Sequence, residues 1–315
     1  MPHWSDVVSS VFVRNVANRY VVDNPLEAFD IFPDVPTTKL AGYLAKYKKA
    51  DWFRIGTKND YKRTGATESF GDDYEVDKQS YLVEEFAFHK DITEDDRNEY
   101  DNPYDPVKDA ISFCDNRIRR VLLQNLVDTY IGTGIWGTDL DLSGSSYNQW
   151  DAKTSGVSDA NPVEYILDAK EAIKKTTGYE PNKLIITYDV FKALKTNTHI
   201  TGSIKTTNDK VVTKDLIARL FELDDIRILD AVNSDADDFL VSGTALLVHT
   251  PKKPSKFEPS AGYHMVYKYR GKDKIRTQKI LMEEKNNALR IELAVKVDPL
   301  VVASDLGYYM YNVVS

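Results

Sequence analysis

Cysteine is almost absent from this sequence. Cys114 is the only one among 315 residues, so a disulfide within the chain is excluded, as is usual in a reducing cytosol. No apolar run approaches the ~20 residues that a helix needs to cross a bilayer. The first ten residues, MPHWSDVVSS, lack the basic start and apolar block of a secretory signal. The sequence therefore predicts neither a membrane partner nor a signal peptide.

An excess of basic residues is also missing. Lys and Arg number 41 against 49 Asp and Glu, which gives a formal net charge of -8. This balance argues against a protein whose main task is to grip nucleic acid. An acidic chain can still enclose DNA, because the wall of a container should not adhere to its contents. The length suffices for about two domains with their own cores.

Cofactor and metal motifs are incomplete. Residues Gly132 to Gly137 match GxGxxG, but a predicted helix precedes them and a predicted loop follows, whereas dinucleotide binding needs a strand and then a helix. The segment from Asp139 through Asp141, Ser143 and Gly144 resembles the start of a calcium loop. Its twelfth position is Trp150 instead of the required Glu, so an Asx turn is the favoured interpretation.

Groups for acid–base or nucleophilic catalysis do not form a recognisable set. The five histidines show no metalloprotease-like spacing, and we interpret them as structural: His3, His89, His199, His249 and His264. Three pairs of neighbouring aspartates lie in polar surroundings that would not raise a carboxyl pKa: Asp72-Asp73, Asp95-Asp96 and Asp237-Asp238. We predict no catalytic residue, no cofactor and no metal site.

One long helix dominates what is present. The spacing predicts a helix over 106–131, with Asp105 as its N-cap, Pro106 at its first position, and Gly132 and Gly134 ending it. At 1.5 Å per residue it would extend roughly 38 Å, the span of a whole domain. The predicted buried stripe is Val107, Ile111, Cys114, Ile118, Val121, Leu122 and Leu126. The side predicted to face water or a partner carries Asn116, Arg117, Arg120 and Gln124.

Hydrophobic residues in the first 50 positions follow neither the period of two that a strand shows nor the period of 3.6 that a helix shows. Three prolines (Pro25, Pro33 and Pro36) also interrupt this segment. Their large apolar residues are Trp4, Phe12, Tyr20, Phe29 and Phe32. Two interpretations stay open. The segment is either an irregular lead-in that packs on its own domain or an arm whose aromatic side chains bind a neighbouring copy.

Residues 43–82 predict a long hairpin with almost no core-forming residues in its middle. Seven basic residues and two acids lie between Lys46 and Arg63, and five acids with no base lie between Glu68 and Asp77. An isolated two-stranded ribbon is marginal in water, so a long one needs a surface to lie on. Segregated charges suit contacts that fix register on another subunit. The alternative is a solvated flexible loop.

The remaining elements alternate between strand and helix and then become mostly strands. We expect a strand over 81–89, a short helix opened by Thr93, a connecting segment over 132–156, and a second domain that begins near Asn161. Its predicted helices cover 162–177, 188–195 and 213–222. The predicted strands are 183–187, 226–229, 245–249, 262–269, 274–282, 288–297 and 308–314, with a polar tip at 283–287.

The order of these parts resembles the major capsid protein family of tailed bacteriophages, whose fold herpesvirus capsids and encapsulin shells share. The local sequence agrees from about Ala17 onward. Matching stretches include ADWFRIG (50–56), GATES (65–69), FAFHKDITEDDR (86–97), GIWGTDL (134–140), NQWD (148–151), ANPVEYILDAKEAI (160–173), TGYEPNKLIITYDVFKALK (177–195), HITGSIK (199–205), VVTKDLIARLFEL (211–223), ALLVHTPKKPS (245–255) and DLGYYMYN (305–312).

The resemblance implies an α+β fold with an N-terminal arm, an extended β-hairpin loop, a peripheral domain with a long spine helix, and an axial α/β domain. The implied boundaries are 1–42 for the arm and entry to the peripheral domain, 43–82 for the extended loop, 83–158 for the peripheral domain with its spine helix at 106–131, 159–250 for the axial domain, 251–305 for the return strands with the tip at 283–287, and 306–315 for the final strand to the axial domain.

By the same resemblance, subunit contacts fall on three segments. The extended loop would contribute Lys46, Lys48, Trp52, Phe53, Arg54, Lys58, Lys62, Arg63, Glu68, Asp72 and Asp73. The arm would contribute Trp4, Phe12 and Tyr20. The peripheral tip would contribute Glu283, Glu284, Lys285, Asn286 and Asn287.

The implied function is a non-catalytic major head protein that forms pentamers and hexamers of an icosahedral capsid around double-stranded DNA. The protein would assemble in the host cytoplasm and act in the virion. The shell would form first as a procapsid and expand as DNA enters, and the extended loop and the spine helix would change shape most. Expected partners are other copies of the chain, a portal and, as a further candidate, a decoration protein. An encapsulin-like compartment is the alternative, and a dinucleotide-dependent enzyme using Gly132–Gly137 is a distant one.

Two departures from some relatives shape further expectations. Only about 20 residues precede the resemblance, so we expect a separate scaffolding protein in place of a cleaved built-in scaffold. Some relatives join subunits by a Lys–Asn isopeptide bond, for which Lys58 or Lys62 with Asn286 or Asn287 are the candidates here.

Overall fold

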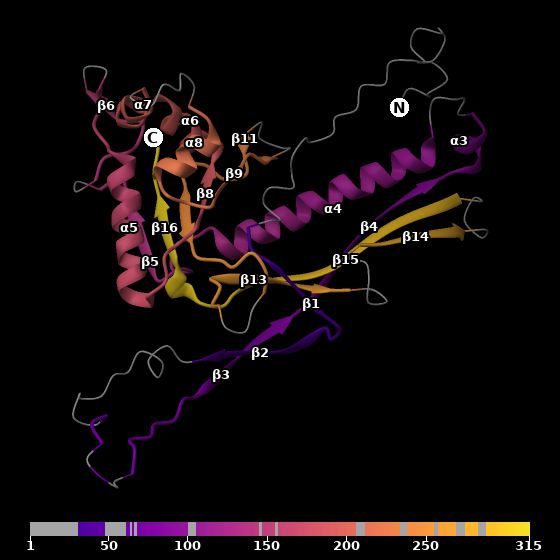
Figure 1. Ribbon diagram of the computed structural model, residues 1–315. Helices are drawn as coiled ribbons and strands as arrows, with labels where there is room; N and C mark the ends of the chain where they lie inside the picture. The colour runs from indigo at the N-terminus through magenta and orange to yellow at the C-terminus, as the bar shows by residue number, and fades with distance from the viewer. Residues whose placement is uncertain are drawn as a thin grey trace.

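The computed structural model describes residues 31–47, 61–63, 65, 68–99, 105–144, 147–154, 157–205, 212–233, 238–254, 258–268, 275–282 and 288–315. Three parts are visible in Figure 1: a rounded α/β body, an arm built on the long helix α4, and a thin hairpin that projects from the junction of the other two. The arm and the hairpin leave the body in different directions.

The arm combines one long helix with a twisted sheet. Helix α4 (Pro106–Tyr130) lies lengthwise against β15 (Ala288–Val301) and β4 (Glu84–Ile92), which pair antiparallel from Leu289 with Ile92 to Val297 with Glu84. Strands β14 (Ile275–Met282) and β13 (Gly262–Tyr267) also pair antiparallel with β15, and β1 (Asp34–Thr37) pairs parallel with β13. The sheet order is therefore β1-β13-β15-β14, with β4 on β15.

Helix α4 forms where the sequence predicts it. The side chain of Asp105 accepts hydrogen bonds from the backbone N–H groups of Val107 and Lys108, which caps the helix. The helix ends at Tyr130, one residue before the predicted limit, and Ile131 is its C-cap. The buried residues are Ala110, Cys114, Ile118, Leu122, Leu123, Leu126 and Tyr130. Val121 was wrongly predicted to be buried: it lies on the solvent side of the helix.

The body is a five-stranded sheet in the order β5-β16-β12-β8-β9. Its strands are β5 (Thr138–Asp141), β8 (Lys183–Thr187), β9 (Asp225–Leu229), β12 (Ala245–Val248) and β16 (Gly307–Tyr311), and its helices are α5 (Pro162–Thr177), α6 (Tyr188–Thr196), α7 (Thr198–Lys205) and α8 (Lys214–Leu220). Central strands are buried on both faces, which explains their continuous apolar runs.

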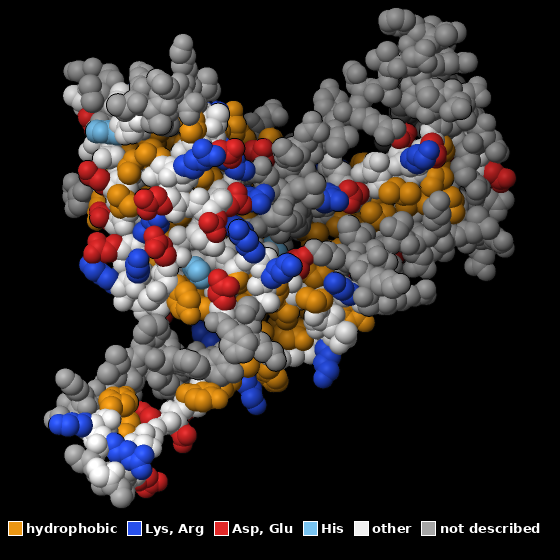
Figure 2. All heavy atoms as spheres, in the orientation of Figure 1, with side chains coloured by type: hydrophobic (Ala, Val, Ile, Leu, Met, Phe, Trp, Pro, Cys, Tyr) orange, Lys and Arg blue, Asp and Glu red, His pale blue; other side chains and the backbone are white. Residues whose placement is uncertain are grey.

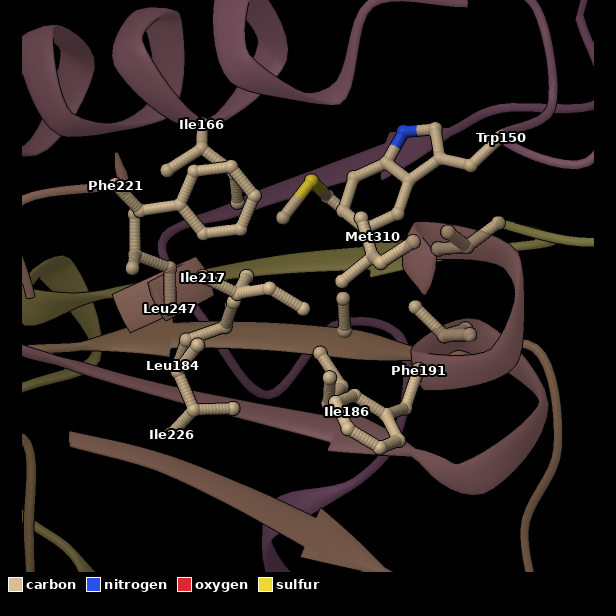
Figure 3. Close-up of a cluster of buried hydrophobic side chains, with 14 of the residues drawn as sticks. Trp150, Ile166, Leu184, Ile186, Phe191, Ile217, Phe221, Ile226, Leu247 and Met310 are labelled. Atoms are coloured by element: carbon tan, nitrogen blue, oxygen red, sulfur yellow. The ribbon is translucent and has the colours of Figure 1, made fainter. Parts of the chain in front are cut away.

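Alternate residues of these strands enter two different cores. Leu184 and Ile186 of β8, together with Leu247 and Met310, pack with Trp150, Ile166 and Phe221 in the body (Figure 3). Ile185, Leu246 and Tyr309 point to the opposite face, where they pack with Leu126, Tyr130 and Trp136 at the end of α4. The second core therefore joins the body to the arm.

The hairpin consists of β2 (Ala41–Tyr47) and β3 (Val76–Leu82), paired antiparallel from Ala41 with Leu82 to Tyr47 with Val76. Both strands project away from the body and from α4 (Figure 1). Smaller described elements are α3 (Glu94–Glu99), η3 (Ser304–Leu306), the ribbon β6 (Lys153–Thr154) with β7 (Val157–Ser158), and the ribbon β10 (Val232–Asn233) with β11 (Asp238–Phe239).

Three secondary-structure predictions need correction. The strand predicted over 81–89 is broken at Val83, because the chain leaves the hairpin there and enters the sheet as β4. Helix α7 was not predicted, since Gly202 and two threonines weaken its helical pattern. The predicted connecting segment contains β5, which pairs parallel with β16 and so depends on the last strand of the chain. The other predicted helices and strands agree with the structure to within a few residues.

Replacing Gly307 with alanine should destabilise the fold. A Cβ atom at this position would overlap the six-membered ring of the buried Trp136, so the indole or the strand must shift. We expect Gly307→Ala to lower the free energy of unfolding by about 1–3 kcal/mol, measured by chemical denaturation. The control is Gly202→Ala in α7, where nothing lies within 4 Å and alanine should be neutral or slightly stabilising. Equal stability of Gly307→Ala and wild type would contradict this packing.

Candidate assembly surface

The β2–β3 hairpin exposes several large apolar side chains. Tyr43 is 72% exposed and Leu82 is 62% exposed, and Val76 at the far end of β3 is also exposed. Towards the end of the hairpin, Tyr61 and Phe70 are exposed and contact each other with ring centroids 5.5 Å apart. Large apolar side chains on so thin an element point to burial by another molecule.

Six of the charged residues predicted for the extended loop lie on this hairpin, in its strands or beyond them. Lys46 lies partly buried on β2, and Lys62, Arg63, Glu68, Asp72 and Asp73 are all exposed beyond the paired strands. Among the other residues predicted for the extended loop, Lys48, Trp52, Phe53, Arg54 and Lys58 lie outside the described residues. The arm residues Trp4, Phe12 and Tyr20 and the tip residues Glu283, Glu284, Lys285, Asn286 and Asn287 lie outside them too.

Sequence reasoning missed the exposed apolar side chains of the hairpin. Tyr43, Phe70, Tyr74 and Leu82 were not singled out, because in the sequence an apolar residue is equally compatible with a core position. The available signal was that they lie in a stretch with few other core-forming residues. The exposure itself is a property of the tertiary arrangement.

A small set of contacts fixes the direction in which the hairpin leaves the body. The backbone N–H of Val83 donates to the carbonyl of Leu40 (2.7 Å), which closes the hairpin at its base. The hydroxyls of Thr37 and Tyr81 lie 3.0 Å apart. Val83 is buried against Tyr263 and Met265 of β13. These contacts tie β1, the two hairpin strands and the sheet of the arm into one joint.

Asp298 of β15 adds a charged contact to this joint. Its Oδ2 accepts a hydrogen bond from the backbone N–H of Leu82 at 2.9 Å. Burial raises the pKa of the Asp298 carboxyl above its ordinary value, and the nearby carboxylate of Glu84 raises it further, while the Leu82 N–H lowers it. Asp298 thus connects the last residue of the hairpin to the central strand of the arm.

The Gly132–Gly137 segment does not have the geometry of a dinucleotide site. Helix α4 precedes it and strand β5 follows it, in the reverse of the order that a pyrophosphate site needs. Trp136 fills the segment from within, and its Nε1–H donates to the carbonyl of Tyr130 at 2.7 Å. Gly137 donates its N–H to the carbonyl of Ser304. The segment therefore packs at the junction of the arm and the body, through its contacts with Tyr130 and Ser304.

The calcium-like segment is an Asx turn, as the sequence favours. Oδ1 of Asp141 accepts hydrogen bonds from the backbone N–H and the hydroxyl of Ser143 and from the side-chain amide of Asn312. The amide of Asn312 lowers the pKa of the Asp141 carboxyl most, and the Ser143 bonds lower it further. Among the described residues, no group of three or more His, Cys, Asp or Glu is arranged to hold a metal ion.

Two buried ionisable side chains have structural roles. The ammonium of Lys170 on α5 donates to the carbonyls of Phe221 and Glu222 at 3.0 and 3.1 Å and pairs with Glu180. It thereby neutralises the carbonyl end of α8. Nδ1 of His249 lies 2.7 Å from the carbonyl of Glu180, which fits the predicted structural role. In the described part of the chain, no helix is long and apolar enough to cross a membrane.

Comparisons with known proteins agree on one architecture. No protein-family model matches the chain. A curated relative, the major capsid protein of Burkholderia phage BcepMu, is 27% identical over 165 residues, which cover 49% of this chain and 51% of the relative. The chain therefore aligns with about half the length of that relative.

Solved structures match over almost the whole chain. A phage-related protein from Bordetella bronchiseptica superposes with a TM-score of 0.67 at 20% identity, covering 92% of both chains. The capsid of Cyanophage P-SCSP1u gives 0.61 at 10% identity over 98% of this chain and 93% of the other. The SrpI encapsulin of Synechococcus elongatus gives 0.55 at 11% identity over 96% and 95%. The chain has the α+β fold of tailed-phage major capsid proteins and encapsulins, so the resemblance predicted from the sequence is confirmed.

Replacing Asp298 with asparagine should change the pH dependence of stability in a defined direction. Because the carboxyl pKa is raised in the folded chain, ionisation of Asp298 costs stability as pH rises from its ordinary value near 3.8 through the folded value. An asparagine side chain cannot ionise and still offers an oxygen to the N–H of Leu82. We therefore expect Asp298→Asn to be more stable than wild type at pH 7, with a smaller difference at pH 4, measured by urea denaturation.

Asp298→Ala is the control for the hydrogen bond itself. It removes both the charge and the acceptor, so it should be less stable than Asp298→Asn at either pH. An Asp298→Asn protein that is less stable than wild type at pH 7 would show that the charge contributes favourably at the joint.

Proposed function

We propose that this chain, whose fold is that of the tailed-phage major capsid proteins, is a major capsid protein that builds a phage head. Many copies would form pentamers and hexamers of an icosahedral shell around double-stranded DNA. The chain would form and break no covalent bond. Its contribution would be repeated contact, through the arm, the extended loop and the peripheral tip, with neighbouring copies.

The observation that carries this proposal is the projecting hairpin. It exposes Tyr43 and Tyr74, its strands project from the junction of body and arm (Figure 1), and its end carries the charges predicted for subunit contacts. A hairpin of this length with no core of its own is stable when it lies on another surface. A second copy supplies that surface in a shell, where each copy both gives and receives one hairpin.

A compartment that holds protein in place of DNA is the second candidate. The encapsulin match supports it, because a fold this similar forms the shell of an encapsulin. The sequence similarity to the major capsid protein of phage BcepMu favours the phage head. A separate scaffolding protein, a portal and a decoration protein are further proposed partners of the phage head.

Expression of the chain, alone and together with its genomic neighbours, tests the shell and its content. We expect closed particles of uniform size by negative-stain electron microscopy, with nuclease-protected double-stranded DNA in particles from infected cells. Particles that instead retain one abundant cargo protein and no DNA would favour the compartment. A chain that stays monomeric under all these conditions would contradict both shell functions.

Removing the far end of the hairpin should separate folding from assembly. Tyr47 and Val76 are a paired position, so residues 48–75 can be replaced by Asn-Gly, which forms a two-residue turn between antiparallel strands. We expect this shortened chain to keep its circular dichroism spectrum and unfolding midpoint, because the cores lie elsewhere. Particle formation, followed by sedimentation, should be lost.

Gly202→Ala serves as the control for assembly, since it changes one exposed residue of α7 without touching the hairpin. Particles formed by the shortened chain at the wild-type level would show that the hairpin is dispensable. If the shortened chain fails to fold, residues 48–75 contribute to the stability of the body, which contradicts the expectation.

A further inference from the structure

We propose that His249 and Glu258 form an acid-dependent contact at the place where the chain passes from the body to the arm. When the imidazole of His249 gains a second proton, its Nε2–H binds the Glu258 carboxylate. This contact ties the segment that leads into β13 to the end of β12. The inference concerns the single chain, so it is independent of the proposed shell function.

Two passages of the chain between body and arm lie next to His249. This residue directly follows β12 of the body, and its carbonyl accepts a hydrogen bond at 3.0 Å from the N–H of Ala261, which directly precedes β13 of the arm. The returning passage lies alongside. The N–H of Val302 donates to the carbonyl of Ala261, and the N–H of His249 donates to the carbonyl of Leu306. A contact that forms at His249 therefore acts on both passages.

The ring of His249 is held in one orientation and is nearly inaccessible to water. The residue is 8% exposed, and its ring packs on Tyr179 with the ring centroids 5.3 Å apart. Nδ1 lies 2.7 Å from the carbonyl oxygen of Glu180. Because a carbonyl can only accept a hydrogen bond, Nδ1 carries the proton of the neutral ring and Nε2 carries the lone pair.

Nε2 faces a carboxylate that it cannot bind while the ring is neutral. It is buried without a hydrogen-bond partner among the described residues, and Oε1 of Glu258 lies 3.8 Å away. Both atoms are acceptors in this state. A second proton makes Nε2 a donor and gives the ring a positive charge. The two atoms then need to approach by about 1 Å to form a charge-assisted hydrogen bond. Imidazole is the side chain that gains charge between pH 8 and pH 5.

Other charges near His249 are engaged elsewhere or are exposed to solvent. The charged residues on the surrounding elements are Lys170 and Lys174 of α5, Glu180, Lys183 of β8, Asp224, Asp305 of η3, and Lys252, Lys253 and Glu258 beyond β12. The Glu180 carboxylate holds both lysines of α5, at 3.3 and 3.2 Å. Lys183 donates to the carbonyl of Ile31, and Asp224 accepts from the side-chain amide of Asn182. Lys252 and Lys253 are exposed.

The charge that decides the state of the ring is therefore local. Acidic and basic side chains are interspersed over the face of the body that Figure 2 shows, so their effects offset each other at a distance. Burial by itself disfavours the charged form of an imidazole. The carboxylate of Glu258 opposes this effect, and it determines whether the buried ring takes up a second proton in mild acid.

Glu258→Gln tests the contact through its pH dependence, because it removes the negative charge and keeps the size of the side chain. We expect its unfolding equilibrium constant, from urea denaturation of the full chain, to equal that of wild type or lie below it at pH 7.5. At pH 5.5 it should exceed the wild-type value about two- to fivefold, since an exposed glutamate is still ionised there. A carboxylate that favours the protonated ring adds stability as pH falls through the range in which imidazole is protonated, and this stability is lost as pH rises.

His249→Asn is the matched variant, since its amide can still donate towards the Glu180 carbonyl but does not titrate. In this background Glu258→Gln should have the same effect at both pH values. Glu171→Gln on α5 controls for the loss of an exposed carboxylate. The bond from Lys175 lowers the pKa of Glu171 below its ordinary value of 4.5, so its removal should have one small effect at pH 5.5 and pH 7.5 alike.

NMR of the imidazole rings gives a readout that does not require His249→Asn to fold. His249 should take up its second proton at a lower pH in Glu258→Gln than in wild type. The inference is overturned if both chains titrate at the same pH, or if the pH-dependent effect of Glu258→Gln persists in His249→Asn. Because these measurements need no assembled shell, their result is separate from that of the particle assay.

Discussion

The structure depends on the packing around Tyr130 at the end of α4. This side chain is fully buried, its ring centroid lies 4.6 Å from that of Phe32, and its hydroxyl donates to the carbonyl of Tyr263. Burial raises the pKa of Tyr130 well above its ordinary value. Trp136 closes the other side and bonds the Tyr130 carbonyl. One residue thereby connects the helix, the sheet of the arm and the start of β1.

This junction fixes the directions in which the arm and the β2–β3 hairpin leave the body. The face of the body sheet that carries Ile185 and Leu246 packs on the same cluster, so the body and the arm share one continuous core. The hairpin is held by a few contacts at Leu40, Val83 and Asp298. The body and the arm therefore share many buried contacts, whereas the hairpin is held at its base by few.

The face of the arm sheet away from α4 carries charges that are paired within the chain. On the sheet face away from α4, Arg290 makes a two-bond pair with Asp91, and Lys296 pairs with Glu85 at 3.2 Å. These residues are cross-strand neighbours in register. Charges that are already paired within one chain gain little from a second partner.

The local elements could be predicted from the sequence because their signals are local. The N-cap at Asp105, the capping pair of Thr93 with Asp96 and the left-handed Gly178 after α5 all act within a few residues. Two-sided burial made β8 and β12 recognisable as apolar runs. The order of these parts also led to the capsid fold, and the chain superposes on such a capsid over almost its whole length.

Tertiary structure alone decided which of the apolar residues are exposed. Val121 and Tyr43 have side chains suited to a core, and nothing in their neighbours marks them as exposed. Their exposure follows from the direction of the sheet under α4 and from where the hairpin leaves it. Likewise, Asp298 lies 216 residues from Leu82 in the chain, and only the folded arrangement brings its carboxylate to that N–H. The sequence determined the elements through short-range forces, whereas the exposed surfaces of the arm and the hairpin arise from contacts between distant segments.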